Sequence, residues 1–238
     1  MMIYLYNSFE NIPGRETEFS VPAVIDVFRA STTIAAALSN GAEKIFPVMT
    51  VEEAFSLKNE LNISGVLLGG ERQGHKVNGF DLGNSPFEYD EITVKGKTII
   101  LSTTNGTKSL LKVGAAGTAV ICGFINMHKV VQYLQREADI TIVLSGKEDR
   151  FSLEDAVCGG MLISEMLKLK DYELNDGAKS AHQLFLSVKN DYVNFLRKCD
   201  HGVYLRSIGF ERDVEFCLTL NKLDIIPVYK EGAITSYE

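Results

Sequence analysis

Short apolar segments alternate with helical segments over residues 21–150 of this 238-residue chain, and this alternation constrains the fold more than any other feature. The expected strands and helices follow one another as Val24–Val27, Thr32–Asn40, Lys44–Val48, Val51–Leu61 and Gly65–Leu68. Strands that alternate with helices of this length are typical of a mainly parallel sheet with helices on both faces. We therefore expect an α/β fold of the three-layer α/β/α kind.

The same order recurs further along, as Thr98–Leu101, Lys108–Val113, Thr118–Cys122, His128–Glu137 and Ile140–Leu144. The motif Leu38-x-x-Gly41 at the end of the first helix is matched by Leu111-x-x-Gly114 at the end of its counterpart. Any two βαβ units look somewhat alike, but this match favours an internal duplication of a βαβαβ unit. Its repeat-like halves would cover about residues 21–74 and 97–150.

Residues 151–238 are expected to be more helical, with helices over Leu153–Lys168, Ala178–Lys198 and Val214–Leu220. A last strand is expected over Ile225–Tyr229. It contains Pro227, which cannot donate a hydrogen bond to a neighbouring strand, so we expect it at the edge of the sheet. No linker stands out along the chain, and we expect a single α/β domain over residues 1–238.

The chain carries 31 acidic and 24 basic residues, which gives a net charge of −7. This balance disfavours nucleic acid or an anionic membrane as a partner, although local arginines can still bind a small anion. We find neither a membrane-spanning apolar run nor the basic start and apolar core of a signal peptide. The four cysteines form no Cys-x-x-Cys pair, as expected of free thiols in a cytoplasmic protein, and a homo-oligomer is left open.

The segment with the most chemical content joins the strand over residues 24–27 to the helix after it. Asp26 stands at the end of the strand, and Arg29 and the hydroxyls of Ser31 and Thr32 lead into the helix. A carboxylate there can bind magnesium, attack phosphorus or orient a water molecule, and an arginine can clamp an oxyanion. The alternative is a structural Asp–Arg pair at the junction of a strand and a helix.

Two further polar segments follow the strand over residues 65–68. The first is a glycine-rich turn that contains Glu71 and Arg72 and lets a ligand approach the backbone. The second is an irregular segment in which Asp81, Asn84 and Ser85 supply oxygen ligands and hydrogen-bond donors. Either segment could also be an ordinary turn with solvated side chains.

The strand over residues 98–101 is followed, at an expected helix N-terminus, by hydroxyl and amide side chains around one glycine, in the order Thr103, Thr104, Asn105, Gly106 and Thr107. Such a helix start suits phosphate or sulfonate oxygens, although it could be no more than an over-supplied helix cap. Lys147, after the strand over residues 140–144, would add positive charge to the same edge. Asp155 is either a further metal ligand or an acid that caps a helix start.

All of these segments follow the carboxyl ends of expected strands, and open α/β sheets bind ligands beyond that edge. The four histidines show no metal-ligand spacing, and His128, His182 and His201 are expected at the surface. There is no Gly-x-Ser-x-Gly elbow, no P-loop and no cysteine with an obvious base partner. Acyl transfer and nucleotide chemistry therefore lack support.

In its ordered motifs the chain resembles the 2-phosphosulfolactate phosphatase family, over about residues 20–165. The motifs are Asp26-Val-Phe-Arg29-Ala-Ser31-Thr32-Thr33, Gly70-Glu71-Arg72-x-Gly74, Phe80-Asp81-x-Gly83-Asn84-Ser85-Pro86, Thr103-Thr104-Asn105-Gly106-Thr107, Ser145-Gly146-Lys147 and Glu154-Asp155. The resemblance implies a magnesium-dependent phosphomonoester hydrolase that converts 2-phospho-3-sulfolactate to 3-sulfolactate and phosphate, a step toward coenzyme M. Another small anionic phosphomonoester, or a non-catalytic sensor that binds anions, remains an alternative.

The roles within such a site can be assigned in part. Mg²⁺ would bind carboxylates, with Asp26 the best candidate, Glu71 and Asp81 next, and Asp155 as an ambiguous fourth. The nucleophile is either a metal-activated water or the Asp26 carboxylate itself. Haloacid-dehalogenase phosphatases carry a second Asp two positions after the nucleophile, and this chain has Phe28 there. We therefore favour water.

Overall fold

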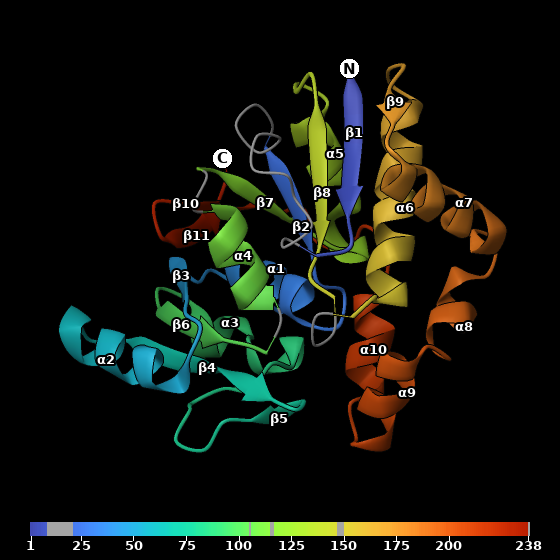
Figure 1. Cartoon of the computed structure of the whole chain (residues 1–238). Helices are drawn as coiled ribbons and strands as arrows, with labels where there is room; N and C mark the ends of the chain where they lie inside the picture. Colours follow the sequence, from blue (N-terminus) through green and yellow to red (C-terminus); the bar gives the residue numbers. More distant parts are fainter. Residues whose placement is uncertain (9–20, 105, 115–116, 147–149, 238) are drawn as a thin grey trace.

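The computed structural model describes residues 1–8, 21–104, 106–114, 117–146 and 150–237, in which eleven strands form one sheet flanked by helices (Figure 1). The strands are β1 (Met2–Tyr6), β2 (Pro22–Ile25), β3 (Lys44–Pro47), β4 (Val66–Arg72), β5 (His75–Lys76), β6 (Thr98–Ser102), β7 (Ala119–Cys122), β8 (Ile140–Leu144), β9 (Glu173–Leu174), β10 (Pro227–Lys230) and β11 (Ala233–Ser236). The helices are α1 (Ala30–Ser39), α2 (Val51–Leu61), α3 (Glu91–Val94), α4 (Gly106–Gly114), α5 (Met127–Leu134), α6 (Leu153–Leu167), α7 (Asp176–Val188), α8 (Tyr192–Leu196), α9 (Asp200–Ser207) and α10 (Glu211–Cys217). The predicted α/β class is confirmed.

The two predicted repeat units exchange their first strands. The sheet order is β5-β4-β6-β3-β11-β10-β7-β2-β8-β1-β9. Strand β2 of the first unit lies between β7 and β8 of the second, and β6 of the second lies between β3 and β4 of the first. All four pairings are parallel. The sheet thus contains two matching triplets, β4-β6-β3 and β8-β2-β7.

The hairpin of β10 and β11 joins the two triplets and sets their relative direction. The pairings β7–β10, β10–β11 and β11–β3 are all antiparallel, so the triplets run in opposite senses. The carboxyl ends of β2 and of β4 and β6 therefore do not lie along one edge of a uniformly parallel sheet, as the sequence led us to expect. The polar segments after these strands nevertheless come together, since residues from all of them line one cavity.

The position of β10 corrects one prediction. We expected an edge strand because of Pro227, but β10 lies between β7 and β11. Proline is tolerated there because it is the first residue of the strand, where its missing N–H removes little from the ladder. Glu231 and Gly232 both have positive φ, 51° and 85°, which is the backbone of a tight two-residue hairpin turn. The returning strand β11 was not predicted from the sequence.

The long helix predicted over residues 178–198 is divided into α7 and α8. The chain turns after Val188, whose carbonyl accepts a hydrogen bond from Asp191 N at 2.9 Å. Tyr192 then stacks on Phe124, with ring centroids 4.9 Å apart, and donates a hydrogen bond to the carbonyl of Leu218. Packing of an aromatic side chain therefore overrides a pattern that is helical throughout.

Strand β2 shows how the layers are separated. Ala23 and Ile25 belong to one apolar cluster, together with Val157 of α6, whereas Val24 belongs to another, together with Ile34 of α1. Successive side chains of a strand point to opposite faces, so α1 and α6 cover opposite sides of the sheet. This arrangement confirms the expected layers of helices and leaves the end of β2 open to the cavity.

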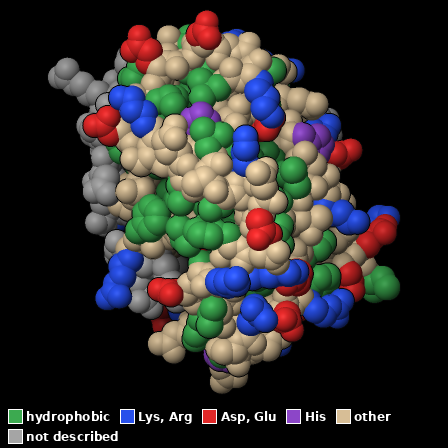
Figure 2. All heavy atoms as spheres, turned by 90° about the vertical axis from the view of Figure 1, so that its right-hand side faces the viewer, with side chains coloured by type: hydrophobic (Ala, Val, Ile, Leu, Met, Phe, Trp, Pro, Cys, Tyr) green, Lys and Arg blue, Asp and Glu red, His purple; other side chains and the backbone are tan. Residues whose placement is uncertain are grey.

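The outer face at α7 to α9 mixes basic and acidic side chains with apolar ones (Figure 2). None of the helices in the described ranges has the length and hydropathy that crossing a membrane would require.

Candidate active site

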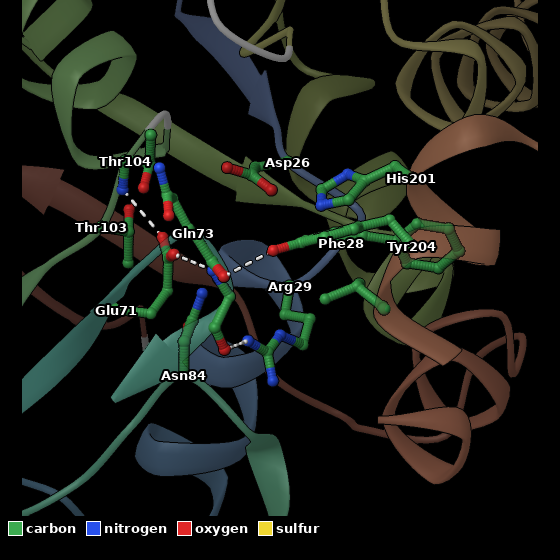
Figure 3. A pocket seen from close by; sticks show the side chains of 12 residues that line it. Asp26, Phe28, Arg29, Glu71, Gln73, Asn84, Thr103, Thr104, His201 and Tyr204 are labelled. Carbon is green, nitrogen blue, oxygen red and sulfur yellow. Dashed lines mark hydrogen bonds between the residues drawn. The ribbon is translucent and has the colours of Figure 1, made fainter. Parts of the chain in front are cut away.

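A cavity of about 280 Å³ lies at the end of β2 (Figure 3). Four predicted segments and one helix that the sequence did not indicate line it. They contribute Asp26, Phe28 and Arg29 after β2, Glu71, Gln73 and Gly74 at the end of β4, Asn84 after β5, Thr103 and Thr104 after β6, and His201, Tyr204 and Leu205 from α9. Figure 3 shows Glu71, Thr103 and Thr104 on one side, His201 and Tyr204 on the other, and Asp26 between them.

Asp26 is held at the junction of β2 and α1. Its backbone N–H donates to Ser31 Oγ at 3.0 Å, and its carboxylate accepts a hydrogen bond from the backbone N–H of Ala30. Burial raises the pKa of Asp26 to about 7; His201 opposes this shift, whereas the negative charges of Glu71 and Glu154 add to it. The carboxyl group is therefore poised to gain or lose a proton near neutral pH.

Gly106 brings the N-terminus of α4 against Asp26. A Cβ atom at this position would lie 2.6 Å from Asp26 Oδ2 and 2.7 Å from Ala30 Cβ, closer than any side chain allows. Because Gly106 has no side chain, the first turn of α4 can lie next to that of α1, and both helices begin beside the same carboxylate. Two helix N-termini favour negative charge nearby, so this corner of the cavity suits an anion.

Glu71 connects the segments that follow the neighbouring strands β6 and β4. Its Oε1 accepts a hydrogen bond from Thr104 N at 2.9 Å, and its Oε2 accepts one from Gly74 N at 2.8 Å. These bonds tie the loop before α4 to the turn after β4. The carboxylate lines the same cavity as Asp26, and its charge acts on the pKa of Asp26.

Asn84 presents an unpartnered polar atom in the cavity wall. Its side chain is 5% exposed, and its Oδ1 has no hydrogen-bond partner within the described part of the protein. The hydroxyl of Thr33 in α1 donates to the Asn84 carbonyl at 2.9 Å, which fixes the residue in place. A buried polar atom without a partner costs about 1–3 kcal/mol, so Oδ1 is well explained as a contact for a ligand.

The threonines before α4 shape the loop. Thr103 N donates to Thr107 Oγ1, and Thr107 N donates to Thr103 Oγ1, both at 3.2 Å. The two hydroxyls thus cap the start of α4 reciprocally. Asn105, predicted as a substrate ligand in this loop, lies outside the described residues.

Comparison with known proteins shows the family of this chain. The family model described as 2-phosphosulpholactate phosphatase matches residues 6–232. The chain belongs to this family. A relative from Carboxydothermus hydrogenoformans, named as a probable 2-phosphosulfolactate phosphatase, is 48% identical over 214 residues, which cover 90% of this chain and 87% of the relative. Relatives with the same name from Caldanaerobacter subterraneus and Clostridium perfringens are 37% and 39% identical and cover 98% and 100% of this chain, and 98% and 97% of their own lengths. The chain is thus a phosphoric monoester hydrolase.

In this phosphatase, Arg29 is occupied by protein partners. Its Nη1 donates to Asp213 Oδ2 at 2.8 Å, its Nη2 donates to the Gly74 carbonyl at 2.7 Å, and its guanidinium lies 4.0 Å from the centre of the Phe210 ring. Ser85 Oγ donates to the other oxygen of Asp213 at 2.9 Å. Arg29 is therefore not a free oxyanion clamp. It forms a structural Asp–Arg pair, the alternative considered from the sequence, but its partner is Asp213 and not Asp26.

Two other predicted residues are bound away from the cavity lining. Asp81 pairs with Lys58 at 3.2 Å and accepts a hydrogen bond from Leu68 N at 2.8 Å. Arg72 donates to both the carbonyl and the hydroxyl of Ser102, at 3.0 and 2.9 Å. The structure therefore does not bring Asp81 or Arg72 to Asp26.

Asp155 is buried behind the site. Its Oδ1 accepts a hydrogen bond from Val27 N at 2.8 Å, and its Oδ2 accepts one from Gly146 N at 3.2 Å. Ser31 and Thr32 likewise lie buried in α1 behind Asp26, and Lys147 lies outside the described residues. These contacts shape the turns after β2 and β8.

The contribution of α9 was not predicted from the sequence. His201, expected at the surface, lines the cavity, and its Nδ1 lies 2.8 Å from Glu154 Oε1. The Tyr204 hydroxyl donates to the Gln73 carbonyl at 2.9 Å, which joins α9 to the turn after β4. No spacing between histidine and acid in the sequence signals this pair, since its members belong to different helices.

A metal ion in this cavity would be bound by carboxylate and amide oxygens together. No group of three or more His, Cys, Asp or Glu side chains in the described ranges could hold a metal ion. Two carboxylates, Asp26 and Glu71, and the unpartnered Asn84 Oδ1 do line one cavity. Mg²⁺ prefers oxygen ligands and commonly uses one or two carboxylates together with water and substrate phosphate, so these donors suit it.

Proposed function

We propose that this phosphatase hydrolyses a small phosphomonoester with several negative charges, in a reaction that requires Mg²⁺. The expected substrate is 2-phospho-3-sulfolactate, which matches the name carried by the relatives. The observation that carries the proposal is the unpartnered Asn84 Oδ1 in the same small cavity as Asp26 and Glu71. An oxygen-rich wall beside two helix N-termini is suited to a phosphate group and a divalent cation together.

Asp26, Glu71 and Asn84 would hold the cation. When bound, Mg²⁺ would neutralise the charge on the phosphoryl oxygens and increase the acidity of a bound water. Burial raises the pKa of Asp26 to about 7, and a bound cation would favour the ionised form of this carboxyl group. The protein itself orients the phosphate against the start of α4 and excludes bulk water through Phe28 and Leu205.

Water is the proposed nucleophile. Phe28, two positions after Asp26, is an apolar wall of the cavity and cannot serve as an acid or base for an aspartyl-phosphate intermediate. An acid quench during turnover of ³²P-labelled substrate distinguishes the routes. Water attack leaves no label on the protein, whereas label retained on Asp26 would contradict this assignment.

Phosphate release from 2-phospho-3-sulfolactate tests the function as a whole. We expect turnover with Mg²⁺ and loss of turnover in EDTA, recovered when Mg²⁺ is restored. A panel of other small phosphomonoesters, assayed in the same way, defines the substrate class. Folded protein that binds these compounds and releases phosphate from none of them would overturn the proposal in favour of an anion sensor.

A further inference from the structure

His201 lies on the side of the cavity opposite Glu71, in the first turn of α9. Its side chain is 17% exposed, and Figure 3 shows its ring directed into the cavity toward Asp26. The ring packs edge-on against Phe28, with centroids 5.8 Å apart. Phe28 therefore supports one side of the imidazole, and the other side of the ring faces the cavity.

Glu154, at the start of α6, fixes the orientation of this imidazole. Its Oε1 lies 2.8 Å from His201 Nδ1, and its Oε2 accepts a hydrogen bond from Cys199 Sγ at 3.5 Å. Burial acts to raise the pKa of Glu154, but the hydrogen bond and charge of His201 outweigh it and lower that pKa. An ionised glutamate at Nδ1 keeps a proton on that nitrogen, which leaves Nε2 as the atom that exchanges protons with the cavity.

Hydrolysis of an alkyl phosphate needs such a group. The leaving oxygen of a 2-hydroxy acid is a strongly basic alkoxide, and departure without a proton is slow. Glu71 accepts two backbone N–H groups, and Arg29 is bonded to Asp213 and Gly74, so neither is placed to donate a proton. Asp26 is assigned to the cation, and among the other lining residues His201 has a ring nitrogen, Nε2, without a hydrogen-bond partner in the described part of the protein, which can donate the proton.

We propose that His201 is the catalytic acid that protonates the leaving oxygen, and that Glu154 is its positioning residue. The step rests on the proposed function. The oxygen of water bonds to phosphorus while the ester P–O bond breaks, and the bonding pair moves to the leaving oxygen. That oxygen takes the Nε2 proton of His201 and becomes the product hydroxyl. Phosphate leaves with both protons of the attacking water, and the imidazole regains its proton from solvent.

The test compares two leaving groups. The product of p-nitrophenyl phosphate is a stabilised phenolate that departs without a proton, whereas 2-phospho-3-sulfolactate yields an alkoxide. For His201→Gln we expect kcat to fall about 10²- to 10⁴-fold with 2-phospho-3-sulfolactate and less than about fivefold with p-nitrophenyl phosphate. Glu154→Gln should lower kcat for the sulfolactate ester in the same selective way and leave KM unchanged.

Two controls complete the design. His128→Gln removes a surface histidine that also pairs with an acid, Asp224, at 2.7 Å, and should change neither rate. Added imidazole should restore turnover of 2-phospho-3-sulfolactate by His201→Ala. An equal loss with both substrates together with no rescue, or no loss at all, would overturn the role of His201. Wild-type protein that turns over neither substrate would instead refute the proposed function.

Discussion

Asp26, at the end of β2, and Asp155, in the first turn of α6, are two buried carboxyl groups beside the same turn, and they differ in what they face. Asp26 is 8% exposed and lines the cavity, with a hydrogen bond from Ala30 N–H. Asp155 is 2% exposed, does not line the cavity, and accepts hydrogen bonds from two backbone N–H groups. Burial raises the pKa of both, so a raised pKa alone does not distinguish the carboxyl group that lines the cavity from the one behind it.

Two buried aspartates, Asp155 and Asp213, hold the residues next to Asp26 in place. Asp155 binds Val27 N, in the turn that carries Asp26, and thereby holds that turn from behind. Asp213 does the same for Arg29 on the other side. Asp26 itself faces the cavity. Substitutions of Asp26 and Asp155 should therefore have opposite consequences for activity and stability.

The largest effect should follow from Asp26→Asn. The variant keeps the shape of the side chain and loses the charge that would hold the cation, so we expect kcat/KM to fall about 10³-fold or more. Phosphate release under saturating Mg²⁺ measures it. Circular dichroism of the same sample checks folding. Activity within tenfold of wild type would remove Asp26 from the centre of the site.

The same variant should be more stable than wild type at high pH. Because the folded-state pKa of Asp26, about 7, lies above the ordinary value of 3.8, wild type loses stability as the pH rises between these values. Asp26→Asn lacks this loss. In EDTA we expect its advantage in unfolding free energy to be near zero at pH 4 and on the order of 4 kcal/mol at pH 8. Urea titrations at both pH values measure it; an equal difference at the two would contradict the assigned shift.

Asp155→Ala should act mainly on stability. It leaves the N–H groups of Val27 and Gly146 buried without acceptors, which we expect to lower the free energy of unfolding by on the order of 3 kcal/mol. Urea unfolding at pH 7 gives the value. A variant as stable as wild type, yet inactive, would reverse the division between the two aspartates.

Gly106→Ala tests the close approach of α4. The added methyl group would lie 2.6 Å from Asp26 Oδ2 and must displace that carboxylate, so we expect kcat to fall about 10²-fold. The matched control is Gly123→Ala, where a Cβ atom would meet its nearest neighbour at 3.7 Å and should be tolerated. Equal effects of the two substitutions would argue against a special role for Gly106.

The smallest effect should come from Asp81→Asn. Its carboxylate is bonded to Lys58 at the surface and to Leu68 N, so we expect kcat/KM and its dependence on Mg²⁺ to stay within about threefold of wild type. Steady-state kinetics over a range of Mg²⁺ concentrations suffice. A marked rise in the Mg²⁺ requirement would restore the original prediction that Asp81 is a metal ligand.

The sequence predicted those parts of the fold and site that depend on local pattern. Alternating strands and helices gave the α/β class, and polar residues at strand ends gave Asp26, Glu71, Asn84, Thr103 and Thr104. The exchange of first strands between the repeat units was not predictable, because strand order depends on pairing between distant segments. Pro227 was misleading for the same reason, since proline restricts one position of a strand and not the place of the strand in the sheet.

The lining residues that sequence reasoning missed belong to the C-terminal helix α9. His201 reaches the cavity only because α9 packs against Phe28 and Glu154, and Asp213 finds Arg29 only in the folded chain. Neither carries a motif of its own. Their partners are distant in sequence, so no local spacing could have indicated them.

The most direct test of the central claim is a crystal structure of the protein with Mg²⁺ and orthophosphate. We expect the cation to contact Asp26, Glu71 and Asn84 Oδ1, with the phosphate against the first turn of α4. Cation and phosphate bound beside Asp81, or at any place away from Asp26, would contradict the account.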